Sequence, residues 1–548
     1  MKNGRFLLFF AALTFTLIPL LSFAKTPVKS STAIAKAQKD VAVSGCYECH
    51  EPIQALHAEN KHKAINCISC HTDLAKHSED ASVRPVTDVS WEACGTCHTD
   101  QMKTFMETSY HRPARDDKSQ PTNRIPVWWD KLMAPHGFTK EHALTRPHVM
   151  ALLDQYVVDR AFGGRFQPKN GWEYVLETGK VWDIIEDKYP NEKGQKVFLP
   201  QTATAANPIC ISCKTADHIL DWAYMGDPGK GAKWDRTSNV VEFAKSTNYA
   251  LNCYFCHDPH SAQPRIIRDA LIDALEDPNG DSAWHKDPGR TKINVITLGL
   301  RGYERKIAIL EKADSRLMCA QCHVEYNCNP GTDLATGQPV TFADRRTNIF
   351  PLQDALHLYD FYFKKINFGD FKNLFDGATL WKAQHPEFET YYDSTHSKLG
   401  IDCDDCHMQP VMKGKNKLYT SHMAKSPRYI AKDTCLKSGC HNTWTEEQAI
   451  YTVDSVKAYT KGRMRKAEFW LSTLIDRIRE ARNLGIDVKA AQTAHTQAHI
   501  LWEYWTAENS DGFHNPALAR ESLTRSITIS AAAVAELEKA ISDRSVKK

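Results

Sequence analysis

The sequence predicts a mainly α-helical protein with little β structure, in which short helices and loops come first and long helices form the C-terminal end. Two observations support this fold class. One kind of cysteine motif recurs up to residue 445, and in the first hundred residues it leaves little room for ordinary secondary structure. From residue 446 onward the chain is rich in Ala, Leu, Ile, Lys and Glu at helical spacing and carries no such motif.

The repeated motif is Cys-x-x-Cys-His, at which c-type haem is attached to a polypeptide. It occurs six times, against ~0.02 occurrences expected by chance. A seventh copy has lysine in place of histidine, and an eighth has four residues between its cysteines. The sequence therefore predicts a multihaem cytochrome c with eight covalent haems, which use sixteen of the seventeen cysteines. The copies are Cys46/Cys49/His50, Cys67/Cys70/His71, Cys94/Cys97/His98, Cys210/Cys213/Lys214, Cys253/Cys256/His257, Cys319/Cys322/His323, Cys403/Cys406/His407 and Cys435/Cys440/His441.

Lys214 marks the candidate catalytic haem. A lysine must lose its proton to bind iron, and it normally carries that proton at neutral pH. Electron-carrying haems are usually closed on both faces, whereas a haem that binds substrate keeps one face open. Because a haem that only transfers electrons has no need of an amine ligand, we expect the chemistry to take place at Lys214.

The N-terminus predicts export. Lys2 and Arg5 precede an apolar run at residues 6–21, and residues 22–24 form a small-x-small cleavage site, so residues 1–24 are expected to be a secretory signal peptide. No later stretch is long and apolar enough to span a bilayer, which predicts a periplasmic protein. Without Lys2 and Arg5 the formal charge falls from +3 to +1. The haem propionates then make it negative, about −7 when oxidised, which argues against a nucleic-acid partner.

The seven histidine-ligated haems need further histidines on the opposite face of each iron. Seventeen of the 24 histidines lie outside the motifs. Four of them, His57, His62, His77 and His111, lie near the first three motifs, and we expect three of these four to be ligands, with His62 and His111 as our choices. The sequence leaves their pairing with individual haems open.

The segment from 114 to 207 carries no motif but many aromatic residues, prolines and glycines. We expect it to cover a haem face. Within it, Arg160 and Arg165 flank a Gly-Gly pair. A guanidinium over the open haem would orient an anion, whereas the simpler interpretation is a turn with a solvated arginine.

The remaining cysteine, Cys328, follows Tyr326 by two residues. A lone cysteine is normally buried and inert, and a phenol near a haem normally serves packing. Their spacing also admits a Tyr/Cys thioether, which would lower the pKa and the redox potential of the phenol.

Four runs together resemble the ammonia-forming cytochrome c nitrite reductases: the lysine motif, Cys-Ala-Gln-Cys-His-Val-Glu-Tyr, Lys-Ala-Gln-His-Pro-Glu and Gly-Phe-His-Asn-Pro. The resemblance covers roughly Val149 to the C-terminus. The three extra N-terminal motifs and Cys328 are similar to the octahaem branch, in which a Tyr/Cys crosslink and a hexameric assembly are known. The resemblance implies reduction of nitrite to ammonium, with hydroxylamine and sulfite as side substrates. Electrons would come from a periplasmic or membrane quinol-linked donor.

The resemblance also implies residue roles. Lys214 would be the proximal ligand of the catalytic haem, facing Tyr326, His385 and Arg160, with Arg165 as the other candidate arginine. Calcium would be held by Glu325, Gln384 and the backbone carbonyls of Tyr326 and Lys382, an oxygen-rich shell that suits this ion. The distal ligands would be His396, His422, His514 and His148 for the haems at Cys435, Cys253, Cys403 and Cys319, respectively.

The predicted organisation has four parts: the signal peptide at 1–24, a trihaem domain and linker at 25–148, a catalytic pentahaem domain at 149–445, and a helical scaffold and oligomerisation region at 446–548. Two other function classes stay open. One is an enzyme of the octahaem tetrathionate reductase or hydroxylamine oxidoreductase type, since the former can also use lysine. The other is a non-catalytic electron-transfer cytochrome, with all irons six-coordinate. The runs around Tyr326 and His385 favour nitrite reductase.

Overall fold

The computed structural model describes residues 43–107, 128, 131–132, 148, 151, 188–190, 196–198, 211–217, 221–222, 232–298, 304–327, 331–341, 343–413, 417–437 and 439–546. The chain divides into two compact units, which are taken in turn. The first comprises Met1–Cys49 with Ile65–Thr87, and the second comprises His50–Ala64 with Asp88–Lys548.

The first unit is built from short elements around two cysteine motifs. Its strands β1 and β2 are antiparallel, with His71 opposite Thr87. This pairing lets the His71 Nδ1 contact the Thr87 hydroxyl at 3.0 Å. The elements are α2 (Val43–Tyr47), η1 (Cys67–Ser69), β1 (His71–Thr72), α4 (Leu74–Glu79) and β2 (Val86–Thr87).

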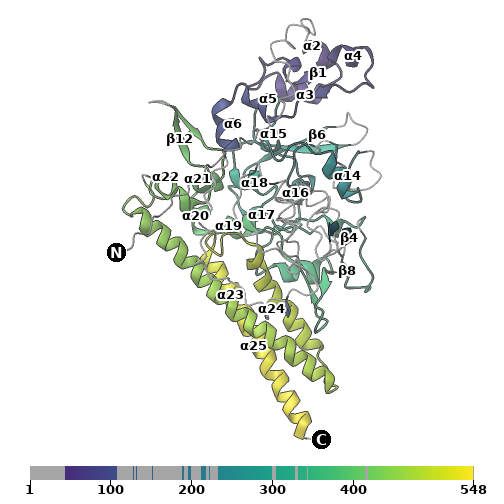
Figure 1. Ribbon diagram of the computed structural model, residues 1–548, viewed down its shortest axis with the longest axis vertical. Helices are drawn as coiled ribbons and strands as arrows, with labels where there is room; N and C mark the ends of the chain where they lie inside the picture. The colour runs from purple at the N-terminus through teal and green to yellow at the C-terminus, as the bar shows by residue number, and fades with distance from the viewer. Residues whose placement is uncertain are drawn as a thin grey trace, which may run out of the picture. The chain divides into compact units, whose positions relative to one another are not determined.

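The second unit contains most of the described residues, and its cysteine motifs also lie on short helices (Figure 1). The short helical elements are α3 (Glu51–His57), α5 (Trp91–Gly95), α6 (Thr99–Met106), α14 (Val240–Lys245), α15 (Cys253–Cys256), α16 (Asp269–Glu276), α17 (Ala283–Lys286), α18 (Ser315–Cys319), η6 (Arg345–Thr347), η7 (Asp360–Lys365), α19 (Glu387–Tyr392), α20 (Thr395–Lys398), α21 (Cys403–His407), η8 (Pro427–Tyr429) and α22 (Ala431–Thr434).

Strands are few and short, as the sequence predicted. In the described part, one sheet has three strands in the order β5-β7-β6, and the others have two each. β6 and β7 are antiparallel over six residues each and are rich in β-branched side chains, which favour strands. The strands are β3 (Lys188–Pro190), β4 (Lys196–Phe198), β5 (Arg265–Ile266), β6 (Ile293–Leu298), β7 (Arg305–Leu310), β8 (Thr332–Asp333), β9 (Phe368–Gly369), β10 (Phe371–Lys372), β11 (Thr379–Leu380), β12 (Pro410–Lys413) and β13 (Lys417–Thr420).

Three long helices form the C-terminal end, which confirms the predicted helical tail: α23 (Glu446–Asn483), α24 (Lys489–Ala507) and α25 (Pro516–Val546). α23 begins with a capping box between Thr445 and Gln448, which satisfies backbone donors that a helix start leaves unpaired. It ends before Gly485, whose φ of +73° is accessible to glycine at little cost. The helices run alongside one another (Figure 1).

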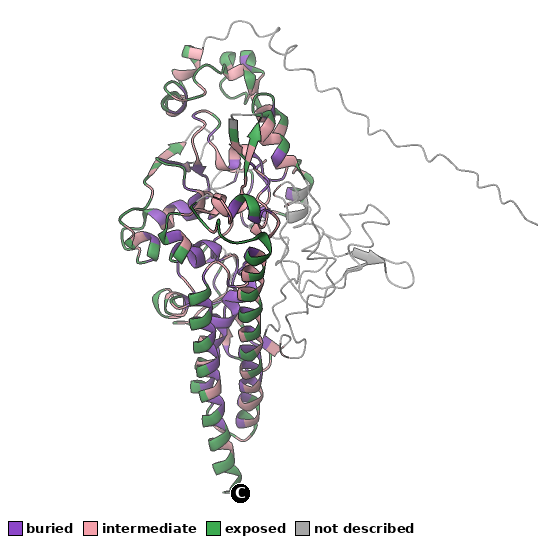
Figure 2. Ribbon diagram, turned by 90° about the vertical axis from the view of Figure 1, so that its left-hand side faces the viewer, coloured by how far each residue is buried: buried purple, intermediate pink, exposed green. Residues whose placement is uncertain are grey.

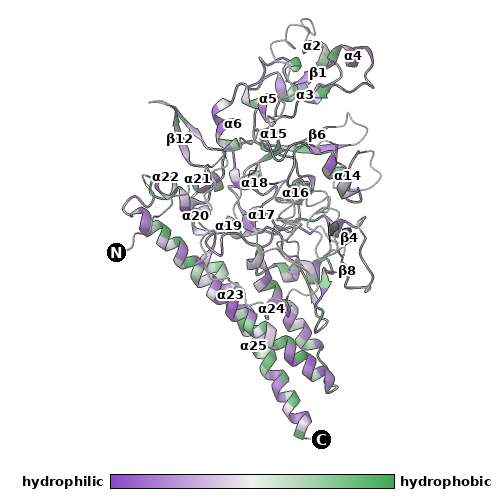
Figure 3. Cartoon of the chain, in the orientation of Figure 1, coloured by the Kyte–Doolittle hydropathy of each residue, from purple (hydrophilic) through white to green (hydrophobic). Residues whose placement is uncertain are grey.

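Burial follows from this packing. Trp502, Tyr504 and Trp505 on α24 are buried with Leu471 and Ile475 of α23 in one core cluster. The outer faces of α23 and α25 are exposed, and hydrophilic and hydrophobic residues alternate along both helices (Figures 2 and 3). No helix in the described part of the chain is long and apolar enough to cross a membrane.

Candidate functional site

The motif cysteines and histidines lie on single helical turns. Residues three and four apart face the same side of a helix, so the two thiols and the histidine of one motif share a face. In three of the short motifs the histidine N–H closes the turn by donating to the carbonyl of the first cysteine. These bonds are His98 to Cys94 at 2.9 Å, His257 to Cys253 at 3.0 Å and His323 to Cys319 at 2.9 Å.

The stretched motif forms the same hydrogen bond from histidine to the first cysteine, because its longer spacer bulges out. The His441 N–H donates to the Cys435 carbonyl at 3.0 Å, although two more residues separate them than in the short motif. Gly439, with φ of +85°, lies in the extra loop, where glycine has no steric penalty. The Cys440 N–H donates to the Lys437 carbonyl at 3.1 Å, so the second thiol lies on a turn of its own. The spacer therefore loops out while the histidine keeps its position relative to the first cysteine.

The second cysteines of the motifs differ in burial, which the sequence did not predict. The backbone geometry is regular, because the N–H groups of Cys70 and Cys97 each donate to the carbonyl of the first cysteine of their motif at 3.2 Å. Cys97 and Cys440 are nevertheless exposed, and Cys70 is half-buried, whereas Cys213 is buried. Haem attachment at all of these cysteines stays a prediction from motif spacing.

Several histidine rings face one another across a fixed gap. Two metal–nitrogen bonds of about 2 Å each, with half an imidazole ring added on either side, put the ring centres about 6 Å apart. Five pairs in the described part, each with one motif histidine, match this spacing. They are His62–His98 at 6.1 Å, His257–His422 at 6.4 Å, His323–His385 at 6.4 Å, His396–His441 at 6.3 Å and His407–His514 at 6.3 Å.

Three of these pairs match the expected distal ligands. The structure brings His396, His422 and His514 to the motifs at Cys435, Cys253 and Cys403, respectively. His62 lies opposite His98, a pairing that the sequence had left open.

The other N-terminal candidates are placed differently. His57 is buried on α3, and the His77 Nδ1 donates to the Val83 carbonyl at 2.7 Å. His111 lies outside the described residues.

The motif at Cys319 has two candidate partners for its histidine. His385 lies 6.4 Å from His323, but the sequence assigns it to the active site. His148 was the expected ligand. Burial, together with the nearby charges of His323 and Lys214, lowers the pKa of His148 to about 4. Both histidines therefore lie in this region.

Cysteine sulfurs of different motifs lie close to one another. The motif at Cys319 contacts three others, so it forms a junction in the second unit. Cys46 also contacts Cys67 within the first unit. The second-unit contacts join Cys94 with Cys253, Cys319 with Cys403, and Cys322 with Cys213, and Gln321 Nε2 lies 4.0 Å from Cys256 Sγ.

The lysine motif is positioned next to this junction. A β-bridge between Thr215 and Ala250 holds the turn that ends in Lys214, and the Cys322 thiol lies 3.5 Å from the Cys213 carbonyl. Cys210 lies outside the described residues, as do Arg160, Arg165 and Cys328. The structure therefore does not test the arginine assignment or the Tyr326/Cys328 crosslink.

An arginine that the sequence did not single out lies beside the lysine motif. Arg268, at the start of α16, is buried and hydrogen-bonded to the Ser212 hydroxyl. Its electrostatic neighbours include Cys213, Cys322 and Tyr326. Its Nε has no hydrogen-bond partner among the described residues. A buried guanidinium with an unused donor suits an anion, such as a haem propionate. Only its burial sets it apart from other arginines, and sequence does not reveal burial.

The two segments expected to form the active site, around Tyr326 and His385, are joined by hydrogen bonds of Glu325. The Gln384 N–H donates to Glu325 Oε2 at 2.8 Å, and the Tyr362 hydroxyl donates to Glu325 Oε1 at 3.3 Å. Tyr326 is buried and stacks on Phe350, with ring centres 5.7 Å apart. The segments that carry Tyr326 and His385 therefore meet.

The proposed calcium ligands lie in the same place. Burial raises the pKa of Glu325 well above its usual value, and the nearby acids Glu389 and Asp370 raise it further. Nowhere in the described ranges do three His, Cys, Asp or Glu side chains converge as a metal site. Calcium would therefore be bound by one carboxylate together with the Gln384 amide and backbone carbonyls, including that of Lys382.

Comparison with known proteins finds relatives over most of the chain. Cytochrome c nitrite reductase subunit NrfA of Nitratidesulfovibrio vulgaris is 26% identical over 414 residues, 71% of this chain and 68% of the relative. Cytochrome c-552 of Haemophilus influenzae is 27% identical over 326 residues, 56% of this chain but only 54% of the relative, so the chain spans about half of that protein.

The solved cytochrome c nitrite reductase of Desulfovibrio desulfuricans, described with two calcium sites, shares the fold with a TM-score of 0.55 and 22% identity. The likeness covers 83% of this chain and 88% of that one. The family model for cytochrome c552 matches residues 161–548, well over half of the sequence. This chain belongs to the cytochrome c552 family.

Proposed function

We propose that this chain is an octahaem cytochrome c that reduces nitrite to ammonium at the haem held by Cys210, Cys213 and Lys214. One observation carries the proposal. The Gln384 to Glu325 hydrogen bond of 2.8 Å joins two segments 59 residues apart, and these segments supply the tyrosine and the histidine of the expected site. The relatives named for nitrite reduction support the same activity.

The residues present fit the haems. Ring separations of 6.1–6.4 Å fit two imidazoles on one iron, and the unused Nε of Arg268 fits a propionate. When bound, the haem at Lys214 would supply an open iron position for the substrate. The Lys214 amine would hold the opposite face and leave this side to Tyr326 and His385.

The side chains of this site suit reduction of an anion. Nitrite must take up six electrons and eight protons to give ammonium and two waters. His385 is the candidate proton donor, because the ordinary histidine pKa lies near neutral pH, and the Tyr326 hydroxyl is a second donor. Arg160 would attract nitrite and stabilise the charge that develops on its oxygens.

Further features support the wider proposal. The contacts from Cys94 through Cys253 to Cys319 support a continuous series of haem sites that ends beside Lys214. The buried oxygens around Glu325 support calcium. A homo-oligomer, with the hexamer as our proposal, follows from the resemblance. We also propose that the protein is exported to the periplasm and receives its electrons from a quinol-linked donor. The domain boundaries proposed are those predicted from the sequence.

The test is the ammonium yield per nitrite with a reduced dye as donor. We expect a yield near one for the wild type. Lys214→His should load haem but lose most of the rate, because imidazole replaces the amine behind the iron. Lys539→His, at an exposed position of α25, is the matched control and should keep the wild-type rate.

Spectroscopy of the same proteins decides between function classes. A high-spin ferric signal that shifts on addition of nitrite supports the catalytic iron. If every haem is low-spin and ignores nitrite, the chain is an electron conduit instead. If sulfur oxyanions or hydroxylamine turn over and nitrite does not, the enzyme belongs to the tetrathionate reductase or hydroxylamine oxidoreductase type.

A further inference from the structure

The histidines assigned to haem iron differ in what holds their second ring nitrogen. Six of these histidines have a described partner for Nδ1, and in four of them it is a backbone carbonyl or a hydroxyl, which fixes the ring without adding a full charge. The carbonyl partners are Pro259 for His62 at 2.7 Å, Thr420 for His422 at 2.9 Å and Lys425 for His407 at 2.9 Å.

His514 is held by a carboxylate. Its Nδ1 donates to Glu508 Oε1 at 2.6 Å, and the Glu508 side chain is 0% exposed. His323 also faces an acid, Glu387, but at 3.3 Å. The bond at His514 is therefore the shorter of the two.

The loop between α24 and α25 fixes Glu508 in place. Its second oxygen, Oε2, accepts hydrogen bonds from the Ser510 N–H at 3.1 Å, the Ser510 hydroxyl at 2.8 Å and the Gly512 N–H at 3.2 Å. These donors satisfy Oε2, so Oε1 is left to His514. The nearby lysines Lys457 and Lys461 pair with Asp511, at 3.3 and 3.0 Å.

A carboxylate in this position changes the ligand chemically. It draws the imidazole proton toward itself and raises the basicity of the nitrogen that faces the metal. A more basic ligand and a buried negative charge both favour the more positive, oxidised iron. A neutral carbonyl has a much weaker effect, because charge-assisted hydrogen bonds are about twice as strong as neutral ones.

We propose that Glu508 lowers the reduction potential of the haem held by Cys403, Cys406, His407 and His514, and so acts as a positioning and tuning residue for that haem. The inference rests on the assignment of His514 as an axial ligand, made under the proposed function. Its effect should be centred on one haem, since among the described residues the carboxylate is bonded to His514, which faces His407 of that motif.

The chain contains a matched control. His495 and Asp376 form a second buried pair, with the same 2.6 Å separation and side chains that are both 0% exposed. His495 faces His499 and not a motif histidine. Asp376→Asn therefore removes a buried charge next to a histidine, as Glu508→Gln does, but that histidine is not a proposed haem ligand.

The experiment is a spectroelectrochemical titration of the holoproteins. In Glu508→Gln one of the haems should shift upward, with an about tenfold higher ratio of reduced to oxidised form at a fixed potential, equivalent to about 59 mV for one electron. Asp376→Asn should leave all potentials unchanged. Unchanged potentials in Glu508→Gln, or the same shift in Asp376→Asn, would overturn the proposal.

Two further variants separate the possible failures. Ser510→Ala removes one donor from Oε2 and leaves more negative charge for His514, so the same haem should shift downward by a smaller amount. This variant decides the matter if Glu508→Gln does not fold, and an upward shift or none would count against tuning. His514→Ala should convert one low-spin haem to high-spin. If all haems stay low-spin, the ligand assignment fails, whereas the nitrite assay tests the activity separately.

Discussion

His499 on α24 is expected to make the C-terminal helices sensitive to acid. Its ring is fully buried. Its Nε2 donates to the Leu132 carbonyl at 3.2 Å, while Nδ1 has no hydrogen-bond partner in the part of the chain that the structure describes. Burial, together with the neighbouring charge of His495, lowers the pKa of His499 to about 3.

The direction of the pH effect on stability follows from the pKa of His499 in the folded and in the unfolded chain. The ordinary histidine pKa of about 6.5 applies to the unfolded chain. As the pH falls, the unfolded chain therefore binds a proton before the folded chain does, and the free energy of unfolding decreases. The loss begins near pH 6.5. At about 1.4 kcal/mol per pH unit it amounts to about 2 kcal/mol at pH 5, and it approaches about 5 kcal/mol near pH 3.

The assay is native-state hydrogen exchange of the α24 amides at pH 7.5 and pH 5. His499→Gln keeps a polar group of similar size but cannot titrate. Over this interval the wild type should lose about 2 kcal/mol more opening free energy than the variant. His357→Gln is the control, since His357 is exposed. Equal pH dependence in the wild type and His499→Gln would refute the reasoning.

Three other variants test the haem site, the loop that carries His514 and the proposed calcium site. Arg268→Gln should lower the reduction potential of the haem beside Cys213, because a buried positive charge favours the reduced iron; a redox titration of the high-spin signal measures this. Gly512→Ala should destabilise the His514 loop by about 1–3 kcal/mol, because Gly512 has φ of +86° and a Cβ there would lie 2.5 Å from Thr460 Oγ1. The thermal midpoint reports that loss. Glu325→Gln should reduce bound calcium in metal analysis, and a chelator should lower the nitrite turnover of the wild type.

The sequence predicted the long helices well because their signal is local. The helical pattern expected from residue 446 onward corresponds to α23, Glu446–Asn483, and the helices after it, because apolar residues at helical spacing are a local signal. The motif turns are local for the same reason. The hairpin of β6 and β7 was not predicted, although its β-branched residues were a usable signal.

Pairing between distant residues was harder to predict. His62 and His98 come together through tertiary packing, and no periodicity in the sequence relates them. Arg268 and Glu508 illustrate the same limit. Their importance lies in burial and in one specific partner each, and charged residues are ordinarily on the surface. Resemblance located His514, but the acid behind it becomes evident only in three dimensions.

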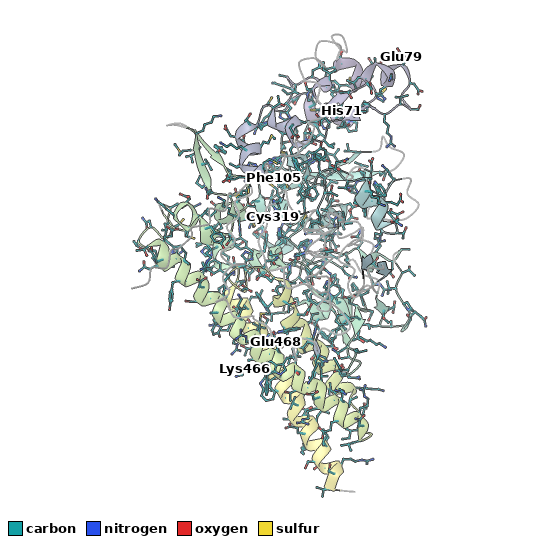
Figure 4. All side chains as sticks on the ribbon, viewed as in Figure 1. His71, Glu79, Phe105, Cys319, Lys466 and Glu468 are labelled. Atoms are coloured by element: carbon teal, nitrogen blue, oxygen red, sulfur yellow. The ribbon has the colours of Figure 1, made fainter. Side chains whose placement is uncertain are left out.

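The C-terminal helices do more than support the haem sites. The loop that follows α24 supplies His514 and Glu508, and its Asn509 donates from the backbone to Glu387 Oε1 at 3.0 Å. The other oxygen of Glu387 contacts His323 at 3.3 Å. Two described motif regions with a carboxylate partner, at Cys319 and Cys403, are therefore contacted by one loop. On α23, Glu468 faces inward and is buried, whereas Lys466 is exposed (Figure 4). Cys319 lies in the body of the second unit (Figure 4). A change that loosens the packing of these helices should therefore alter the redox properties of the two haems before the chain unfolds.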